Sequence, residues 1–332
     1  MSGRCSGLWL VYALGGGWGH LTRAAALARV APGPVRILTN SPYAGEVSAR
    51  LAELDIVALD PELSPARARQ ESVREVQASP AACLIVDTFP RGLGGELAAL
   101  LPECGALRVL IHRDLNPEYV RGKALDEFVR FNYDLVIRPG PAEAAHLAGL
   151  PRARTTAPWL IRSAHELPSR EAARSLLGAD ERQCVLVCAA GNRDEQAWYG
   201  SLTQALSAAL QGVAVRCAAP LCPPGCPAQA WRRYWPAMDL LPGVDLVVGG
   251  AGYNTVNECL ACGVPLLARA WPRKYDRQSL RAAAQAEVCP KSIDDAVAAV
   301  RARLARPGRS ATRREFPNGA REAAEILEAL GA

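Results

Sequence analysis

One of the four histidines of this 332-residue chain stands in a setting suited to proton transfer. The run Gly15-Gly-Gly-Trp-Gly-His20 follows an apolar stretch and opens a segment with helical periodicity. Glycines let the backbone turn tightly there, and a helix N-terminus disfavours the imidazolium, which keeps an imidazole ready to accept a proton. His20 is thus suited to act as a general base. A loop with one histidine is by itself better explained by a residue that only caps the helix or fills the loop.

A second glycine-rich segment, Gly249-Gly-Ala-Gly252, lies in the other half of the chain between an apolar run and a helical pattern. Exposed amides at such a helix N-terminus suit a diphosphate. We expect Asn254 or Thr255 to cap the helix or to contact that phosphate. One turn further along, Glu258 is placed to accept hydrogen bonds from both hydroxyls of a ribose.

A polar cluster, Tyr275-Asp-Arg-Gln278, follows the next apolar run. Its Asp276 and Gln278 suit the hydroxyls of a sugar. A plain strand–helix–strand unit with a capped helix would explain the glycines of the second segment, but not Glu258 together with this cluster. The pattern therefore favours a ligand with diphosphate, ribose and sugar parts.

The first glycine-rich loop is not a dinucleotide fingerprint. A G-x-G-x-x-G run would need glycine where His20 stands, and Thr39-Asn40 ends the second apolar run where an acidic residue would bind a ribose. An NAD-linked dehydrogenase is therefore disfavoured.

Short apolar runs alternate with helical patterns through the first half, which predicts βαβ units and a parallel sheet covered on both faces. The expected strands are Leu8–Leu14, Val35–Thr39, Asp55–Leu59, Cys83–Asp87, Leu107–His112, Asp134–Arg138 and Arg154–Ala157. The expected helices are Leu21–Val30, Tyr43–Leu54 and Asn116–Phe131.

The same alternation restarts after a break at Pro158–Pro168. The expected strands are Cys184–Ala190, Val213–Ala218, Val244–Val248 and Val264–Ala268. The expected helices are Arg170–Leu177, Glu195–Leu210, Thr255–Cys262, Gln278–Ala286, Asp294–Leu304 and Gly319–Leu330. We predict an α/β protein with two Rossmann-like domains that face each other across a cleft, with ligands at the carboxyl ends of the strands.

Composition excludes several other classes of protein. The net charge of +5 comes almost entirely from arginine, without an aromatic-rich RNA-binding motif, so we expect no nucleic-acid partner. We expect a cytoplasmic protein with reduced thiols, because neither a signal peptide nor a membrane-spanning run is present. The pairs Cys222-x3-Cys226 and Cys259-x2-Cys262 lack zinc-finger spacing and are interpreted as small thiols rather than metal ligands.

The two glycine segments together resemble those of the GT-B glycosyltransferases of the MurG-like and UDP-glycosyltransferase group. In that group the first strand ends in a Gly-rich loop with a histidine, and the second domain carries a GGAG-type loop, a glutamate on the next helix and a D-x-Q-like segment. The run Gly17-Trp-Gly19-His20-Leu-Thr-Arg23 also resembles the G-x-G-H-x-x-R loop of a set of predicted bacterial glycosyltransferases, as do the segments Asp87–Arg91 and Arg113-Asp114. The resemblance covers both halves of the chain.

The resemblance implies an inverting glycosyltransferase, of hexosyl- or N-acetylhexosaminyl-transferase type, that uses a nucleoside-diphosphate sugar, with UDP-sugar favoured. It implies that His20 deprotonates an acceptor hydroxyl. Because Asp87 and Asp114 both close strands of the first domain, topology suggests one of them as the residue that orients His20. The donor-binding residues that it implies are Gly17, Gly19, Gly191, Asn192, Gly250, Ala251, Gly252, Asn254, Thr255, Glu258, Asp276 and Gln278. No metal and no cofactor is expected, since helix dipoles and basic side chains hold the diphosphate in this fold.

The resemblance also assigns different roles to three parts of the chain. Residues 1–160 are expected to form the acceptor domain, residues 161–316 the nucleotide-sugar donor domain, and residues 317–332 a helix that packs back on the first domain. The acceptor stays unidentified between a lipid-linked and a small molecule, and related enzymes with lipid acceptors work at the inner face of a membrane. The sequence indicates no oligomeric state.

Two other functions remain open at this point. The G-x-G-H-x-x-R loop also resembles that of UDP-sugar hydrolases, in which the histidine activates water, so a hydrolase or an epimerase on the same fold is one alternative. A non-catalytic nucleotide-binding protein is another, although the joint presence of His20, Glu258, Asp276 and Gln278 argues against it. Trp18 stands where the peptidoglycan enzyme has small residues, which indicates a different acceptor.

Overall fold

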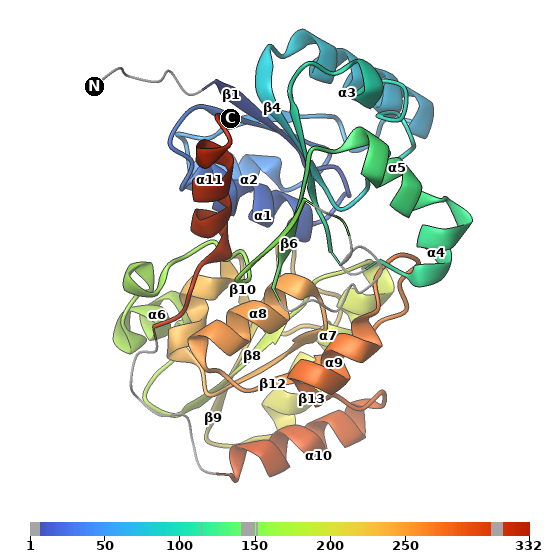
Figure 1. Ribbon diagram of the computed structural model, residues 1–332. Helices are drawn as coiled ribbons and strands as arrows, with labels where there is room; N and C mark the ends of the chain where they lie inside the picture. The colour runs from blue at the N-terminus through green and yellow to red at the C-terminus, as the bar shows by residue number, and fades with distance from the viewer. Residues whose placement is uncertain (1–6, 114, 141–149, 151, 307–314) are drawn as a thin grey trace. The chain divides into compact units, whose positions relative to one another are not determined.

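The computed structural model describes residues 7–113, 115–140, 150, 152–306 and 315–332, and the chain divides into two compact units. Unit 1 comprises Met1–Ile161, Lys274–Asp276 and Pro317–Ala332, and unit 2 comprises Arg162–Arg273 and Arg277–Phe316. Each unit is built on one parallel sheet with helices around it (Figure 1).

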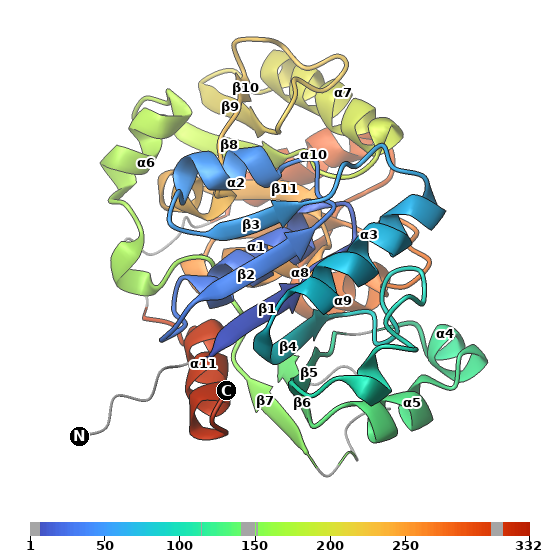
Figure 2. The same cartoon turned by 90° about the horizontal axis from the view of Figure 1, so that it is seen from above.

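Unit 1 has a seven-stranded sheet in the order β3-β2-β1-β4-β5-β6-β7, which Figure 2 shows from above. Its strands are β1 Leu8–Tyr12, β2 Val35–Thr39, β3 Asp55–Ala58, β4 Ala81–Asp87, β5 Leu107–Ile111, β6 Leu135–Pro139 and β7 Ala153–Thr156. Its helices are α1 Trp18–Ala28, α2 Ala44–Arg50, α3 Pro65–Ala78, α4 Pro117–Gly122, α5 Leu125–Asn132 and α11 Gly319–Ala329, with a 3₁₀ turn at Leu101–Glu103. All neighbouring strands are parallel, so the loops that follow them meet at one edge of the sheet.

The last helix, α11, packs against α1 and β7 of unit 1. Its first turn is tied to the chain after β7, because Glu322 accepts a hydrogen bond from the Ala157 amide (2.8 Å) and Asn318 accepts one from the Leu160 amide (3.2 Å). A Cβ at Gly319 would overlap the carbonyl group of Ala157, so only glycine fits there.

Unit 2 has a six-stranded parallel sheet in the order β10-β9-β8-β11-β12-β13. Its strands are β8 Gln183–Cys188, β9 Val213–Ala218, β10 Trp231–Arg232, β11 Leu246–Gly250, β12 Leu266–Arg269 and β13 Glu287–Val288. Its helices are α6 Arg170–Leu177, α7 Arg193–Ala209, α8 Tyr253–Cys262, α9 Gln278–Gln285 and α10 Ile293–Leu304, with 3₁₀ turns at Ala164–Glu166 and Ala237–Gly243.

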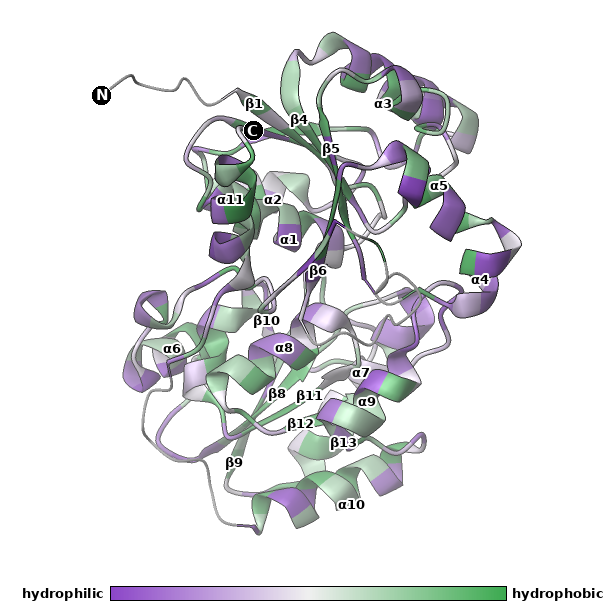
Figure 3. Ribbon diagram, viewed as in Figure 1, coloured by the Kyte–Doolittle hydropathy of each residue, from purple (hydrophilic) through white to green (hydrophobic). Residues whose placement is uncertain are grey.

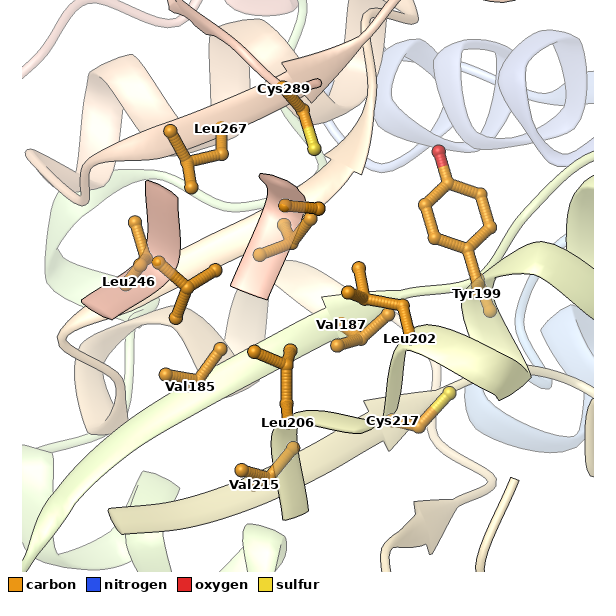
Figure 4. Packing of buried hydrophobic residues seen from close by; sticks show 14 of the residues in the cluster. Val185, Val187, Tyr199, Leu202, Leu206, Val215, Cys217, Leu246, Leu267 and Cys289 are labelled. Carbon is orange, nitrogen blue, oxygen red and sulfur yellow. The ribbon is translucent and has the colours of Figure 1, made fainter. Parts of the chain in front are cut away.

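The strands carry the core of each unit. In Figure 3 the central strands are mostly coloured as hydrophobic residues, whereas α3 and α5 show many hydrophilic ones. Figure 4 shows the unit 2 core, in which Val185, Val187 and Leu246 from the sheet pack with Leu202 and Leu206 from α7. Burial on both faces explains why these strands read as continuous apolar runs in the sequence.

All strands predicted from the apolar runs are confirmed, with ends that differ by a few residues. The single helix predicted at Asn116–Phe131 is wrong, because Ala124 adopts φ +45° and separates α4 from α5. Helix α3 was not predicted, since its sequence is strongly polar, although Ser64 followed by Pro65 is a typical helix start. The two-residue edge strands β10 and β13 are too short to give a periodic signal.

Candidate functional site

The strand order of unit 1 brings together His20 and Asp87, which are 67 residues apart in the chain. β1 and β4 are neighbours, so the loop after β1 and the last residue of β4 share one edge of the sheet. His20 lies in the first turn of α1, and its Nδ1 is 2.9 Å from Oδ2 of Asp87. An ionised carboxylate only accepts hydrogen bonds, so we assign the hydrogen to Nδ1, which leaves Nε2 able to take a proton.

Arg23 completes this cluster and had no role in the sequence-based prediction. It is one turn after His20 on α1 and is almost fully buried, and its guanidinium donates to Asp87 Oδ2 at 2.6 Å. The Thr88 hydroxyl donates to the other carboxylate oxygen at 2.9 Å. The i, i+3 spacing of a histidine and an arginine on one helix face was the signal that could have revealed this role.

These contacts decide the charges of the cluster. Burial opposes ionisation of Asp87, but the neighbouring Arg23 and His20 outweigh it and hold the pKa of the carboxyl well below its usual range. Burial is also the largest influence on His20 and lowers the pKa of the imidazole; Asp87 raises it, and the cations Arg23 and Arg113 lower it again. The imidazole is therefore neutral at pH 7, as a general base must be.

The glycine loop after β1 is shaped by its neighbours. The His20 ring lies directly over Gly15, where any Cβ would overlap the ring. The side-chain oxygen of Asn40 accepts hydrogen bonds from the amides of Gly15 (2.9 Å) and Gly16 (3.0 Å). The asparagine that stands in place of an acidic ribose ligand thus holds the loop, and these two amides are already in use.

Two further residues, Thr88 and Phe89, directly follow Asp87 at the end of β4. Thr88 has φ +75°, a strained value for a β-branched residue, and its amide donates to the Ile111 carbonyl. Phe89 stacks on the His20 ring with centroids 5.7 Å apart. Strained backbone beside a titratable side chain is typical of functional sites, where surrounding packing holds a costly conformation.

Four other predicted residues belong to unit 1. Gly17 is the N-cap of α1 without a side-chain cap, and a Cβ there would meet open space, whereas a Cβ at Gly19 would lie 3.6 Å from the Arg23 guanidinium. Asp114, the alternative to Asp87, lies outside the described residues. Asp276 belongs to unit 1, where its carboxylate lies 3.8 Å from the Arg113 guanidinium.

In unit 2 the second glycine segment joins β11 to α8. Helix α8 begins at Tyr253 with Gly252 as an N-cap that supplies no side-chain hydrogen bond. Of the two roles predicted for Asn254 or Thr255, capping the helix is wrong, because both lie inside the first turn, and the phosphate contact stays a prediction. The first turn of an α-helix has amides without helical partners, so this end can receive an anion. Gly263 ends the helix in the left-handed region (φ +63°).

Not every residue of the segment can offer its backbone. Gly250 is paired within the sheet opposite Arg269, and the amide of Ala251 donates to the Arg269 carbonyl at 3.0 Å. The carbonyl of Ala251 accepts from Arg281 at 2.8 Å. Gly252, which precedes the helix, is not paired with the sheet in this way.

Glu258 lies on α8 one turn inside the helix, as the sequence indicated. Burial, and then the negative charge of Asp239, raise the pKa of its carboxyl to about 7. Asp239 is itself held by a bidentate pair with Arg162, at 2.8 and 2.9 Å. Among the described residues none donates a hydrogen bond to Glu258, so this carboxyl is a candidate acceptor for ligand hydroxyls.

The loop after β8 contains Gly191 and Asn192. Asn192 caps α7, because its side-chain oxygen accepts a hydrogen bond from the Glu195 amide at 3.0 Å. Gly191 has φ +118°, and a Cβ there would overlap the Glu195 carboxylate, which is buried and paired with Arg273. Both predicted residues therefore shape the start of α7 at the same sheet edge as Gly252.

Gln278 is buried and closes the loop between β12 and α9. Its side-chain oxygen accepts a hydrogen bond from the Trp271 amide at 3.0 Å. Its amide nitrogen makes no hydrogen bond within the described part of the chain, so this group can still donate to a ligand. Gln278 belongs to unit 2 and Asp276 to unit 1, so the predicted polar cluster is divided between the units.

A cluster of three aromatic side chains, Trp198, Tyr199 and Trp271, lies beside the loop between β12 and α9 and was not predicted. The Arg269 guanidinium lies 4.1 Å from the ring centroids of both Trp198 and Trp271, and the Trp271 indole donates to the Tyr199 hydroxyl at 2.9 Å. A Cβ at Gly250 would lie 3.5 Å from that hydroxyl, so the aromatic group borders the glycine segment. Residues spread from β12 to α7 gave no local sequence signal for it.

Within the described ranges, no group of three or more His, Cys, Asp or Glu side chains is arranged to hold a metal ion. Ten cysteines in those ranges are free thiols. No described helix combines the length and apolarity needed to cross a bilayer.

The two parallel sheets with their flanking helices, and a strand order of Rossmann type in each, define the GT-B fold. No protein-family model matches the chain, and no curated protein matches it either. The fold is instead established by solved structures.

Three solved glycosyltransferases show the likeness. The glycotransferase of kitacinnamycin is 14% identical, with 98% of this chain and 99% of that chain covered at a TM-score of 0.62. Spinosyn rhamnosyltransferase SpnG, complexed with thymidine diphosphate, is 17% identical over 98% of this chain and 95% of that chain (TM-score 0.58). Glycosyltransferase SsfS6 from Streptomyces sp. SF2575, also complexed with thymidine diphosphate, is 17% identical over 97% and 99% (TM-score 0.56).

Proposed function

We propose that the chain is an inverting glycosyltransferase that moves a sugar from a nucleoside-diphosphate sugar to an acceptor hydroxyl. The observation that carries the proposal is the hydrogen bond between His20 Nδ1 and Asp87, which leaves Nε2 free to act as a base in a protein of GT-B fold. In the proposed step, the acceptor oxygen attacks the anomeric carbon and gives its proton to His20 Nε2. The bond from that carbon to the phosphate oxygen breaks, and the nucleoside diphosphate leaves with the electron pair.

Unit 2 supplies the donor site in this proposal. The diphosphate would lie at Gly252 and the first turn of α8, and the ribose hydroxyls would donate to Glu258. Gln278 would donate from its amide nitrogen to the sugar. The sequence resemblance favours uridine as the base, and thymidine diphosphate is the ligand bound to SpnG and SsfS6. The acceptor would be a small molecule or a lipid-linked alcohol.

The test is a donor screen followed by product analysis. UDP- and dTDP-sugars are first ranked by the rise they cause in the unfolding temperature, since a ligand of the native state stabilises it. The best donors are then incubated with alcohol acceptors, and the products are identified by mass spectrometry, with His20→Ala as a parallel sample. Acceptor-linked sugar formed by the wild type and lost in His20→Ala supports the proposal. Rapid release of free sugar without acceptor would instead identify a hydrolase.

A further inference from the structure

A tight turn in unit 2 holds two cysteines side by side. The run Cys222-Pro-Pro-Gly-Cys226 follows β9, and the Cys226 amide donates to the Pro223 carbonyl at 3.0 Å. Gly225 has φ +78°, the value that a type II turn with proline before glycine requires. The Cys222 thiol reaches across this turn to the carbonyl of Cys226, with a sulfur–oxygen distance of 3.7 Å.

The turn is held against the core rather than left loose. Pro223 is buried, and a Cβ at Gly200 on α7 would overlap the Pro224 carbonyl, so the loop lies directly on that helix. Prolines also restrict the backbone around the turn. The two thiols are therefore kept close while both are reduced.

A third thiol, that of Cys217, lies in the core of unit 2. Cys217 is the fully buried penultimate residue of β9 and belongs to the core drawn in Figure 4. Its interaction with Cys226 lowers the pKa of the Cys226 thiol. Cys226 is half-buried and Cys222 is exposed, so solvent reaches the pair. Thiolates with neighbouring donors and solvent access are the ones that react with oxidants.

We propose that Cys226 and Cys222 form a peroxide-sensitive dithiol site that closes to a disulfide across the Pro223–Cys226 turn. The Cys226 thiolate attacks one oxygen of a peroxide, the O–O bond breaks, and Cys226 becomes a sulfenic acid. The Cys222 thiolate then attacks that sulfur and displaces hydroxide. Overall, two thiols lose two electrons and two protons, and one hydrogen peroxide becomes two waters. Cys217 stays reduced and acts as a positioning residue.

The three thiols share one tryptic peptide, Cys217–Arg232, which makes the test direct. The reduced full-length protein is treated with hydrogen peroxide, its remaining thiols are alkylated, and the peptide is sequenced by mass spectrometry. We expect a peptide with one alkyl group, on Cys217, and an intramolecular disulfide that a reductant removes. A disulfide that includes Cys217, or alkyl groups on all three thiols after the treatment, overturns the proposal.

Variants separate the roles of the three thiols. In Cys222→Ser, the sulfenic acid of Cys226 should persist and be trapped by dimedone. Without oxidant at pH 7, Cys226 should react with iodoacetamide about 3–10-fold faster than Cys104, a half-buried cysteine outside the loop. Cys217→Ala should remove this advantage, whereas Cys104→Ser should leave the labelling of Cys226 unchanged. Equal rates in the wild type would show that Cys226 is an ordinary thiol, and unfolding temperatures confirm that each variant is folded.

Discussion

At the scale of single residues, the orientation of His20 depends on the carboxylate of Asp87, whose negative charge Arg23 already balances. Asp87 sets the tautomer of the imidazole through a 2.9 Å hydrogen bond, and Arg23 limits how far the same carboxylate raises the pKa of His20. Asp87 thus orients the imidazole, and Arg23 balances the charge of the carboxylate. The sequence located His20, and chain topology suggested Asp87, but only the contact of Arg23 with Asp87 at the end of β4 revealed Arg23.

Asp87→Asn should lower kcat by about 10²–10⁴-fold, the usual contribution of general-base catalysis. An amide can offer its NH₂ group to Nδ1, which moves the imidazole hydrogen to Nε2 and removes the lone pair that the reaction needs. The measurement is kcat at saturating donor, with the unfolding temperature as a control for folding. A folded variant with wild-type kcat would remove Asp87 from the mechanism.

Arg23→Gln should move the acidic limb of the pH–rate profile to higher pH. Without the guanidinium, one of the influences that lower the pKa of His20 is lost, so at pH 6 a larger fraction of the base is protonated and inactive than in the wild type. Loss of a buried partner should also cost about 3–5 kcal/mol of unfolding free energy. Arg36→Gln, which breaks the exposed pair with Asp55, is the control and should cost less than about 1 kcal/mol. An acidic limb that stays in place would contradict the assigned role.

Glu258→Gln should weaken nucleotide binding and abolish its pH dependence. Hydroxyl donors favour the ionised carboxyl, so the affinity of the wild type should rise as pH increases through about 7 and protons are released. Calorimetry in buffers of different ionisation enthalpy measures that release. The raised pKa also means that ionisation of Glu258 costs stability as pH rises from about 4.5, its unperturbed value, to 7, so the variant should be more stable than the wild type at pH 8. Wild-type affinity in the variant would exclude the ribose role.

At the scale of elements, the start of α8 is built by backbone rather than by side chains. Gly252 caps the helix without a side-chain hydrogen bond, while the neighbouring Ala251 is fully engaged with Arg269 and Arg281. The sequence predicted the glycine segment and the helix behind it. It misplaced the cap, because Asn254 and Thr255 are both good caps and only the path of the chain after β11 decides which residue begins the helix.

Gly252→Ala tests the role of the start of α8 in nucleotide binding without a change in the fold. A Cβ at Gly252 meets open space, so the unfolding temperature should change little, but it stands where a diphosphate would approach the first turn of α8. We expect nucleotide affinity to fall about 10-fold or more, which corresponds to about 1.4 kcal/mol. Gly105→Ala, in open space on unit 1, is the matched control and should leave both properties unchanged. Full affinity in Gly252→Ala would argue against a phosphate at this helix end.

At the scale of the whole molecule, the proposed catalytic and donor-binding roles are divided between the two units. Unit 1 holds the histidine cluster, and unit 2 holds Glu258 and the start of α8. Segment Lys274–Asp276 interrupts unit 2 in the chain, and Pro317–Ala332 follows unit 2, yet both cluster with unit 1. A domain boundary placed from the order of the sequence does not predict that Lys274–Asp276 belongs to unit 1. This segment joins unit 1 because Tyr275 packs on Tyr119 and Phe89.

Variants of the two units should therefore separate binding from turnover. His20→Ala should keep the full rise in unfolding temperature that a saturating nucleoside diphosphate causes, while its turnover falls. Glu258→Gln should lose much of that rise. Thermal shift and initial rates measured on the same preparations check both statements. A His20→Ala protein that no longer responds to nucleotide would contradict the proposed division.

Local sequence predicts the alternation of strands and helices and the two glycine-rich loops that follow strands, because burial on both faces of a parallel sheet and tight turns leave a local signature. It also determined that a histidine stands at the start of the first helix. The tertiary structure decided which of these residues meet. Strand order places β4 beside β1 and so Asp87 beside His20, and the packing of α1 buries Arg23 against both. Such partners are set by contacts between segments far apart in the chain, for which local sequence carries no signal.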